Sequence, residues 1–343
     1  MEARRQIQPR TTALIAALMA LVMASCVPMS TEPMPDIPQT PEYETVRVEY
    51  GTSDQLGGAN LSWQASVGAA STVALFTRHT VANTNQVLYR YLSTVSYIRT
   101  QRPSRHEHGY YEWETTLQGD YYRFELTEDD AGDVTFELWA GNSASDSAVI
   151  LDGEMTPLED TGQQRQEATG RLRIDLDAAR QYDETVAHGE VFLAFRSARG
   201  IRQVRVGFDE YRESDAHEPL SGIYEYVQLR DATGFFTFFV IEEMGLDGEP
   251  QFLSVDAAWT ADQAGRAHGI YADLSGQVNL EVDKCWAEDQ RVVYQRTSPT
   301  IPSVEGGEVE DCAGSLQGLE LSAPRPDEVG EVVPQVPEPH PEE

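Results

Sequence analysis

The stretch of residues 122–138, YRFELTEDDAGDVTFEL, determines the fold class that this chain is expected to have. Apolar and polar side chains alternate along 122–126 and again along 136–138. A period of two is typical of a strand with one buried face. Between the two runs, Asp130-Ala131-Gly132-Asp133 is a turn signal at hairpin distance. The stretch therefore predicts two consecutive strands that pair antiparallel.

Almost all of the chain after Gly109 repeats this pattern of alternation and turns. Further turn signals stand at Arg199-Gly200, Leu246-Asp247-Gly248 and Ala264-Gly265. We expect about a dozen strands, and open twisted sheets rarely exceed about ten strands before they curl. The prediction is a mainly β fold with a large curved antiparallel sheet, either a half-barrel or a barrel. The other alternating runs are Leu172-Ile174-Leu176, Val204-Val206-Phe208, Leu253-Val255-Ala257-Trp259 and Val278-Leu280-Val282.

One segment ahead of the strands has helical periodicity. Apolar residues recur at three- and four-residue steps along 87–98, Asn83 or Thr84 can serve as the N-cap, and the pattern ends before Pro103. We expect this N-terminal helical region to pack on the concave side of the sheet. Shorter helical pieces are expected at Val73–Val81 and Asp177–Tyr182.

Two predicted strands are apolar on both faces, namely residues 191–195 (VFLAF) and 235–241 (FFTFFVI). Water is therefore expected on neither side of them. One explanation is a core in which the helix, loops or a neighbouring layer cover both faces. The other is a bound lipid or other apolar ligand, for which Phe192, Phe236 and Phe238 are the candidate contacts.

The N-terminus combines a basic start with the apolar run 13–24 and the sequence Ala24-Ser25-Cys26. The run is shorter than the ~20 residues that cross a bilayer as a helix, so it reads as part of a signal peptide. Small residues directly before a cysteine resemble the lipobox of bacterial lipoproteins. The resemblance implies cleavage between Ser25 and Cys26 and acylation of Cys26. Val27, in place of Asp, resembles the pattern exported to the outer membrane.

The domain organisation follows from this signal and from the proline content. Residues 1–25 are the expected signal peptide, and 26–45 a lipidated, Pro-rich tether. Residues 46–322 are expected to form a single mainly β domain. Residues 323–343, rich in proline and acidic residues, are expected to be a disordered tail.

Charge and cysteine content restrict the partners and predict one crosslink. The chain has 57 acidic and 25 basic residues and a net charge of −32. Such a chain repels phosphate groups, which excludes nucleic acid as a partner and also excludes membrane docking through a basic patch. Apart from Cys26, the cysteines are Cys285 and Cys312, which we expect to form a disulfide in an exported protein. This bond is expected to hold Ser315–Leu321 on the sheet.

One cluster has residue types suited to a metal site. If 106–114 is a strand, His106, His108 and Glu112 share a face and could bind zinc. The alternative is an ordinary solvent-exposed strand face, because Tyr111 and Trp113 fall on the other side. Nucleophile elbows, zinc-protease motifs and phosphate loops are absent from the sequence. We therefore expect no enzyme and no cofactor, although carboxylate pairs for polysaccharide hydrolysis are not identifiable by sequence alone.

The order of tether, helix and antiparallel run over residues 71–296 resembles the curved half-barrels of lipoprotein-carrier and lipid-binding envelope proteins. Residues 259–267 (WTADQAGRA) and Cys285-Trp286 are similar to uncharacterised envelope lipoproteins of myxobacterial type. These resemblances imply a non-enzymatic outer-membrane lipoprotein with a binding or structural role, at the periplasmic face or the cell surface. Its partner would be the membrane and another envelope protein. The alternatives are a carrier of a lipid or other apolar ligand, and an envelope polysaccharide or ester hydrolase.

Overall fold

The computed structural model describes most of the chain. It divides into two compact units, residues 1–37 and 38–343, and the elements below belong to the second. The described residues are 34–47, 72–158, 167–212, 214–215, 219–231, 233–242, 251–301, 305–325 and 334–338.

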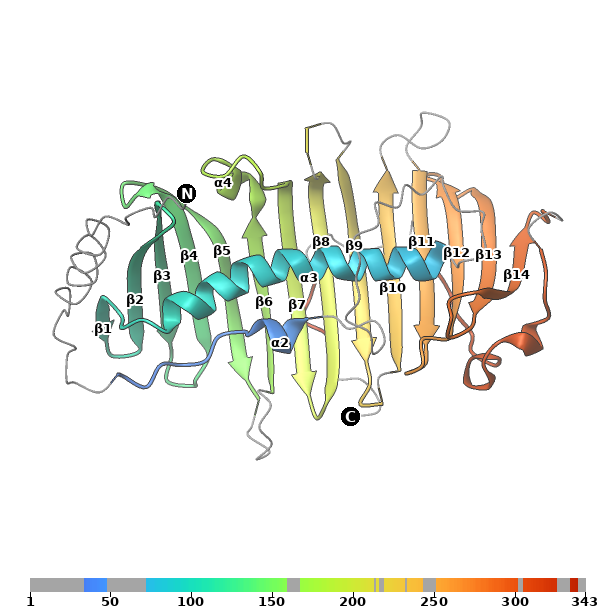
Figure 1. The fold of residues 1–343 in the computed structure, drawn as a ribbon, viewed down its shortest axis with the longest axis horizontal. Coiled ribbons are helices and arrows are strands. Elements are labelled where there is room, and N and C mark those ends of the chain that lie inside the picture. The colour runs from blue at the N-terminus through green and yellow to red at the C-terminus, as the bar shows by residue number, and fades with distance from the viewer. Residues whose placement is uncertain are drawn as a thin grey trace, which may run out of the picture. The chain divides into compact units, whose positions relative to one another are not determined.

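A 14-stranded antiparallel sheet dominates the second unit, and each strand pairs with its neighbours in the sequence (Figure 1). The mainly β class and the large antiparallel sheet are confirmed. The order runs from β1 to β14, and no pairing between these two strands closes the sheet, so the barrel alternative is wrong. The strands are β1 (Arg105–Glu107), β2 (Tyr110–Leu117), β3 (Asp120–Glu128), β4 (Val134–Ser143), β5 (Asp146–Pro157), β6 (Ala168–Asp175), β7 (His188–Ala198), β8 (Ile201–Arg212), β9 (Leu220–Gln228), β10 (Gly234–Glu242), β11 (Gln251–Trp259), β12 (Gly265–Asp273), β13 (Val278–Trp286) and β14 (Val292–Ser298).

Helix α3 (Thr72–Arg99) lies across the strands on one side of the sheet (Figure 1). The predicted apolar stripe is buried, and its helical periodicity is confirmed: Leu88 and Ile98 are 0% exposed. The predicted N-cap is wrong, because the helix begins at Thr72 and Thr84 is a buried residue within it. None of the helices in the described ranges is both long and apolar enough to span a membrane.

The side of the sheet that contacts α3, here called the helix face, contains the main core. Cross-strand register aligns its large side chains, since Phe124 lies opposite both Trp113 and Leu138. Burying each such side chain contributes roughly 1.5–3 kcal/mol. Trp113 also donates its indole N–H to the carbonyl of Gln101 at 3.0 Å, which joins β2 to the chain just after α3. The largest fully buried side chains of the sheet include Trp113, Phe124, Leu126, Phe195, Phe236 and Phe238.

Short turns join the strands where the sequence predicts them. In the β3–β4 turn, the Asp129 carboxylate accepts hydrogen bonds from the backbone N–H of Ala131 and Asp133, and Gly132 takes the positive φ of 85°. Arg199-Gly200 and Ala264-Gly265 also lie at strand junctions, whereas Leu246–Gly248 lies outside the described residues.

The predicted helical turn is helix α4 (Leu176–Arg180). Asp175 is its N-cap, and its carboxylate accepts from the N–H of Ala178 at 2.7 Å. Asp175 is thus both the last residue of β6 and the cap of the helix that follows.

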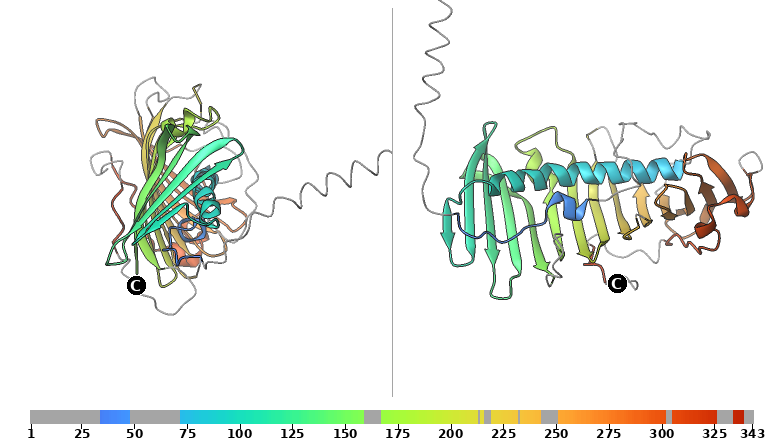
Figure 2. Two further views of the ribbon diagram at one scale, coloured as in Figure 1. Left: turned by 90° about the vertical axis from the view of Figure 1, so that its left-hand side faces the viewer. Right: turned by 60° about the horizontal axis from the view of Figure 1, so that its bottom comes forward.

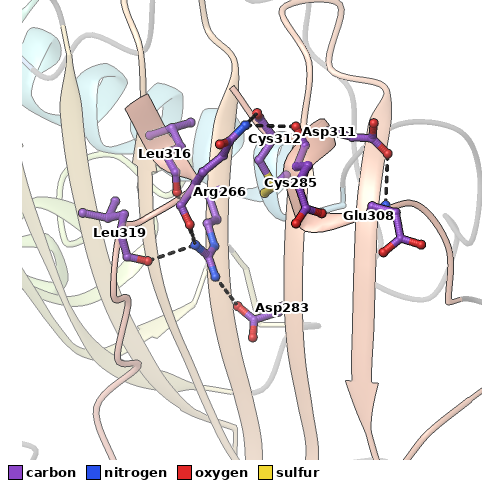
Figure 3. The surroundings of a disulfide bond; sticks show 10 residues. Arg266, Asp283, Cys285, Glu308, Asp311, Cys312, Leu316 and Leu319 are labelled. Carbon is purple, nitrogen blue, oxygen red and sulfur yellow. Dashed lines mark hydrogen bonds and ion pairs between the residues drawn. A yellow bond between two sulfur atoms is a disulfide. The ribbon is translucent and has the colours of Figure 1, made fainter. Parts of the chain in front are cut away.

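Residues 305–325, here called the C-terminal segment, pack on the sheet after β14. The predicted disulfide joins Cys285 of β13 to Cys312, with the Cα atoms 5.6 Å apart. Beside it, Arg266 of β12 donates to the carbonyls of Leu316, Gln317 and Leu319 at 3.0–3.2 Å (Figure 3). Ser315–Leu321 therefore packs on the sheet as predicted, and both Arg266 and the disulfide hold it there. The segment also contains the short helices η3 (Val309–Asp311) and η4 (Gly314–Leu316).

In both Pro-rich ends, some of the described residues are buried. Helix α2 (Tyr43–Val46) lies on the same side of the sheet as α3 (Figure 2), and Thr40 and Val46 are 2% and 0% exposed. In the tail, Ala323, Pro334 and Pro337 are buried. Proline rings are apolar and prefer extended backbone, so a Pro-rich segment can be buried against a sheet without forming a strand. Residues 326–333 and 339–343 lie outside the described part.

Candidate functional site

Under the second half of α3, the described part of the helix face has a small cavity. The cavity between α3 and the sheet, lined in part by Tyr91, Tyr122 and Asp183, has a volume of about 60 Å³. A water occupies about 30 Å³, whereas ligand pockets usually measure 300–1,000 Å³. Phe236 and Phe238, two of the predicted ligand contacts, belong to this filled core and are 2% and 1% exposed. They pack there against other aromatic rings.

The opposite side of the sheet, here called the polar face, carries a larger hollow. A groove of about 450 Å³ lies over strands β3 to β7, with Pro334 of the tail at its margin. Phe192, the third predicted ligand contact, lines this groove and is half-buried. We call it the charged groove; its principal side chains are Glu125, Glu137, Asp152, Glu154, Arg171, Arg173 and Phe192.

Strand register brings these residues together. Glu137 of β4 lies opposite Asp152 of β5. Asp152 in turn lies opposite Arg173 of β6, and Arg173 opposite Phe192 of β7. Successive residues of a strand point to opposite faces, so the immediate neighbours of these four fill the core. The same alternation that buries the helix face therefore builds the charged groove.

Ion pairs hold both arginines of the groove in place. Arg171 lies 2.7 Å from the carboxylate of Glu154, and both side chains are exposed. Exposed pairs contribute only ~0–1 kcal/mol each, so they orient the side chains more than they stabilise the fold. Arg173 contacts three carboxylates, those of Glu190, Asp175 at 3.2 Å and Asp152 at 3.6 Å.

Asp152 has the most perturbed carboxyl of the groove. Burial raises its pKa above the usual value, and the carboxylates of Glu137 and Glu190 act in the same direction, while Arg173 opposes them. Glu137 is exposed and takes part in none of these ion pairs. The groove thus places the exposed side chain of Glu137 beside Asp152, whose pKa is raised chiefly by burial.

Aromatic residues extend the polar face toward β2. The guanidinium of Arg123 stacks over the ring of Trp139, 4.2 Å from its centroid. The Tyr121 hydroxyl donates to Glu114 at 2.8 Å. Burial first, and this hydrogen bond second, raise the pKa of Tyr121 to about 12, so it remains a neutral donor. The surface beside the groove therefore combines flat rings with fixed hydrogen-bonding groups.

The structure does not group the candidate zinc ligands His106, His108 and Glu112 as a metal site. Strand β1 ends at Glu107, the chain turns at His108 and Gly109, and Gly109 has a φ of 71°. Because of this turn, His106 and His108 do not share a strand with Glu112. His106 instead stacks on Tyr111, with the ring centroids 4.5 Å apart. In the described ranges, no three His, Cys, Asp or Glu side chains are grouped to hold a metal ion.

The remaining predicted sites divide between the two ends of the chain. Ser25 and Cys26 lie outside the described residues, so the lipid attachment stays a prediction. The disulfide is as predicted. Apart from Phe192, the residues of the charged groove were not predicted from the sequence, and neither was Arg266. Their only signal in the sequence is a polar position within an alternating strand.

Comparisons with protein-family models, with curated proteins and with solved structures find no match to this chain.

Proposed function

We propose that the protein is a non-enzymatic outer-membrane lipoprotein that binds a polysaccharide of the cell envelope in the charged groove. The observation that carries the proposal is the groove itself, about 450 Å³ of open volume lined by paired carboxylates and guanidinium groups around Phe192. The lipid attachment at Cys26, predicted from the lipobox, would hold this groove within the envelope.

Sugar chemistry suits this lining. A sugar ring has hydroxyl groups that both donate and accept, and a flat C–H face that is apolar. Carboxylates such as Glu137 accept from hydroxyls, and guanidinium groups such as Arg171 donate to them. Phe192 presents an aromatic face for stacking. An apolar ligand would remove water from these charged pairs without forming hydrogen bonds to them, which is unfavourable.

A binding assay with two variants and a matched control tests the proposal. We expect Phe192→Ala and Arg171→Gln each to weaken binding to isolated envelope polysaccharide by about tenfold, or ~1.4 kcal/mol. The control is Arg205→Gln, because Arg205 forms a similar ion pair on the same face, 3.0 Å from Glu225, outside the groove lining. Equal binding by all four proteins, or no binding by the unmodified protein, would refute the proposal.

A hydrolase is the second candidate, favoured by the juxtaposition of Glu137 and Asp152. Two carboxyl groups on adjacent strands are the residue types that glycosidases use as an acid and base pair on a glycosidic bond. Release of reducing ends from the bound polysaccharide, abolished in Asp152→Asn, would establish this activity. Binding without release would leave the protein a binding module.

A further inference from the structure

Helix α3 has an unusual charge pattern for this chain. Its 28 residues include no Asp or Glu, although the chain has 57 acidic residues. An exposed helix surface in water is normally rich in charged side chains. Apart from Arg90, the exposed positions of its second half are uncharged or aromatic, and Tyr89 and Tyr97 are 58% and 55% exposed. We call this surface, formed by Gln86, Tyr89, Ser93, Ser96 and Tyr97, the tyrosine side of α3.

The arginines near this surface are already paired. Arg90 lies 2.5 Å from Asp183, and Arg99 donates to the Thr40 hydroxyl at 2.6 Å and to the carbonyl of Pro38. The tyrosine side therefore presents phenol rings and small polar groups with little net charge.

The N-terminal chain meets the sheet on the same side. Pro38 and Thr40 bond to Arg99 of α3, and the ring of Tyr43 packs edge-on against Tyr89 at 5.2 Å between centroids. A fully extended chain between Cys26 and Pro38 spans at most about 40 Å. Acyl chains on Cys26 would therefore keep the Arg99 end of α3 within about that distance of the membrane.

We infer that the tyrosine side of α3 rests on the lipid headgroups of the membrane that holds the acylated Cys26, which turns the charged groove away from the membrane. The inference depends on the lipid attachment in the proposed function. Tyrosine is suited to this position, because its ring is apolar and its hydroxyl remains hydrated at the interface. Anionic headgroups repel the acidic surfaces of the chain, whereas the acid-free helix avoids this repulsion.

The test uses a fluorophore at one of two positions in the full, lipidated protein. Ser96→Cys places it on the tyrosine side, and Thr135→Cys places it on the polar face. Both Ser96 and Thr135 are exposed. Helix and sheet together separate the two sites by roughly 20 Å. In vesicles of phosphatidylethanolamine and phosphatidylglycerol with nitroxide headgroups, we expect about threefold or greater quenching at position 96 relative to 135. Equal or reversed quenching would overturn the inference.

Further variants separate the causes. Tyr89→Ser with Tyr97→Ser should abolish the difference in quenching, whereas Leu274→Ser, at a residue 49% exposed outside α3, should preserve it. Flotation with the vesicles reports the anchor independently. If the protein does not float, both the lipid anchor and the inference are refuted. If it floats but shows no difference in quenching, only the inference is refuted. A label at 96 that is shielded in solution by a second copy of the chain would also overturn it.

Discussion

Replacing Cys312 with Ala would cut the covalent link between β13 and the C-terminal segment. The bond joins positions 27 residues apart, and closing a loop of that length removes about 3.6 kcal/mol of chain entropy from the unfolded state at 25 °C. The native contacts of the segment survive the substitution, because Arg266 keeps its bonds to three carbonyls and Leu316 remains buried. We therefore expect the free energy of unfolding to fall by roughly 3 kcal/mol.

Urea unfolding followed by tryptophan fluorescence measures this loss, since Trp286 is buried directly after Cys285. Reduced wild-type protein and the double variant Cys285→Ala/Cys312→Ala should unfold at nearly the same urea concentration as the single variant. Local opening of the segment should also increase, so a glutamate-specific protease should cleave faster at Glu305, Glu308 and Glu310. A stability loss below ~1 kcal/mol, or unchanged cleavage, would refute the assigned role of the bond.

Two further predictions concern the same end of the sheet. Gly265→Ala should destabilise the fold by ~2 kcal/mol or more in thermal unfolding, because a Cβ there would lie 2.0 Å from the ring of the buried Trp286. The control is Gly276→Ala, at a φ of 88° with open space around it, which should destabilise the fold less. A larger loss for Gly276→Ala than for Gly265→Ala would contradict the packing argument. His268 Nδ1 lies 3.8 Å from Asp283, its Nε2 lies 3.3 Å from Glu281, and Asp256 also faces the ring. Asp283 is the chief cause of the raised pKa of His268. The stabilisation from these carboxylates is therefore present below about pH 6.5 and is lost as pH rises through the raised pKa. His268→Asn should therefore lower stability by ~0.5–1 kcal/mol more at pH 6 than at pH 9, and a pH-independent difference in denaturation would contradict it.

The fold class could be predicted because its signal is local. Alternation along 122–126 marks a half-buried strand whatever its partner, and short turns require that consecutive strands pair. The start of α3 could not be predicted in the same way. Asn83 and Thr84 have good capping chemistry, but the helix continues through them because tertiary packing outweighs local preference. A cap signal is informative only where the chain has no packing reason to remain helical.

The charged groove could not be predicted because it depends on register between strands. Glu137, Asp152, Arg173 and Phe192 lie on four different strands, and a shift of one residue in any pairing would move a member to the other face. The sequence also does not show which face α3 covers. Phe236 and Phe238 lie on the face that α3 covers and belong to the core, whereas Phe192 lies on the other face and lines the charged groove.

The charge pattern of the polar face bears on what the groove can bind. One register row crosses the sheet from β2 to β14, and several neighbouring pairs in it combine opposite charges or share a side-chain hydrogen bond. In this row, Arg171 is paired with Glu154 and Arg205 with Glu225. Because its arginines are already neutralised, the groove has no uncompensated positive charge with which to attract an anion. A neutral, hydroxyl-rich ligand can still bond to groups that are held in place by their neighbours, and its binding would depend little on salt. The row consists of Tyr110, Thr127, Thr135, Glu154, Arg171, Ala194, Arg205, Glu225, Thr237, Asp256, His268, Asp283 and Arg296.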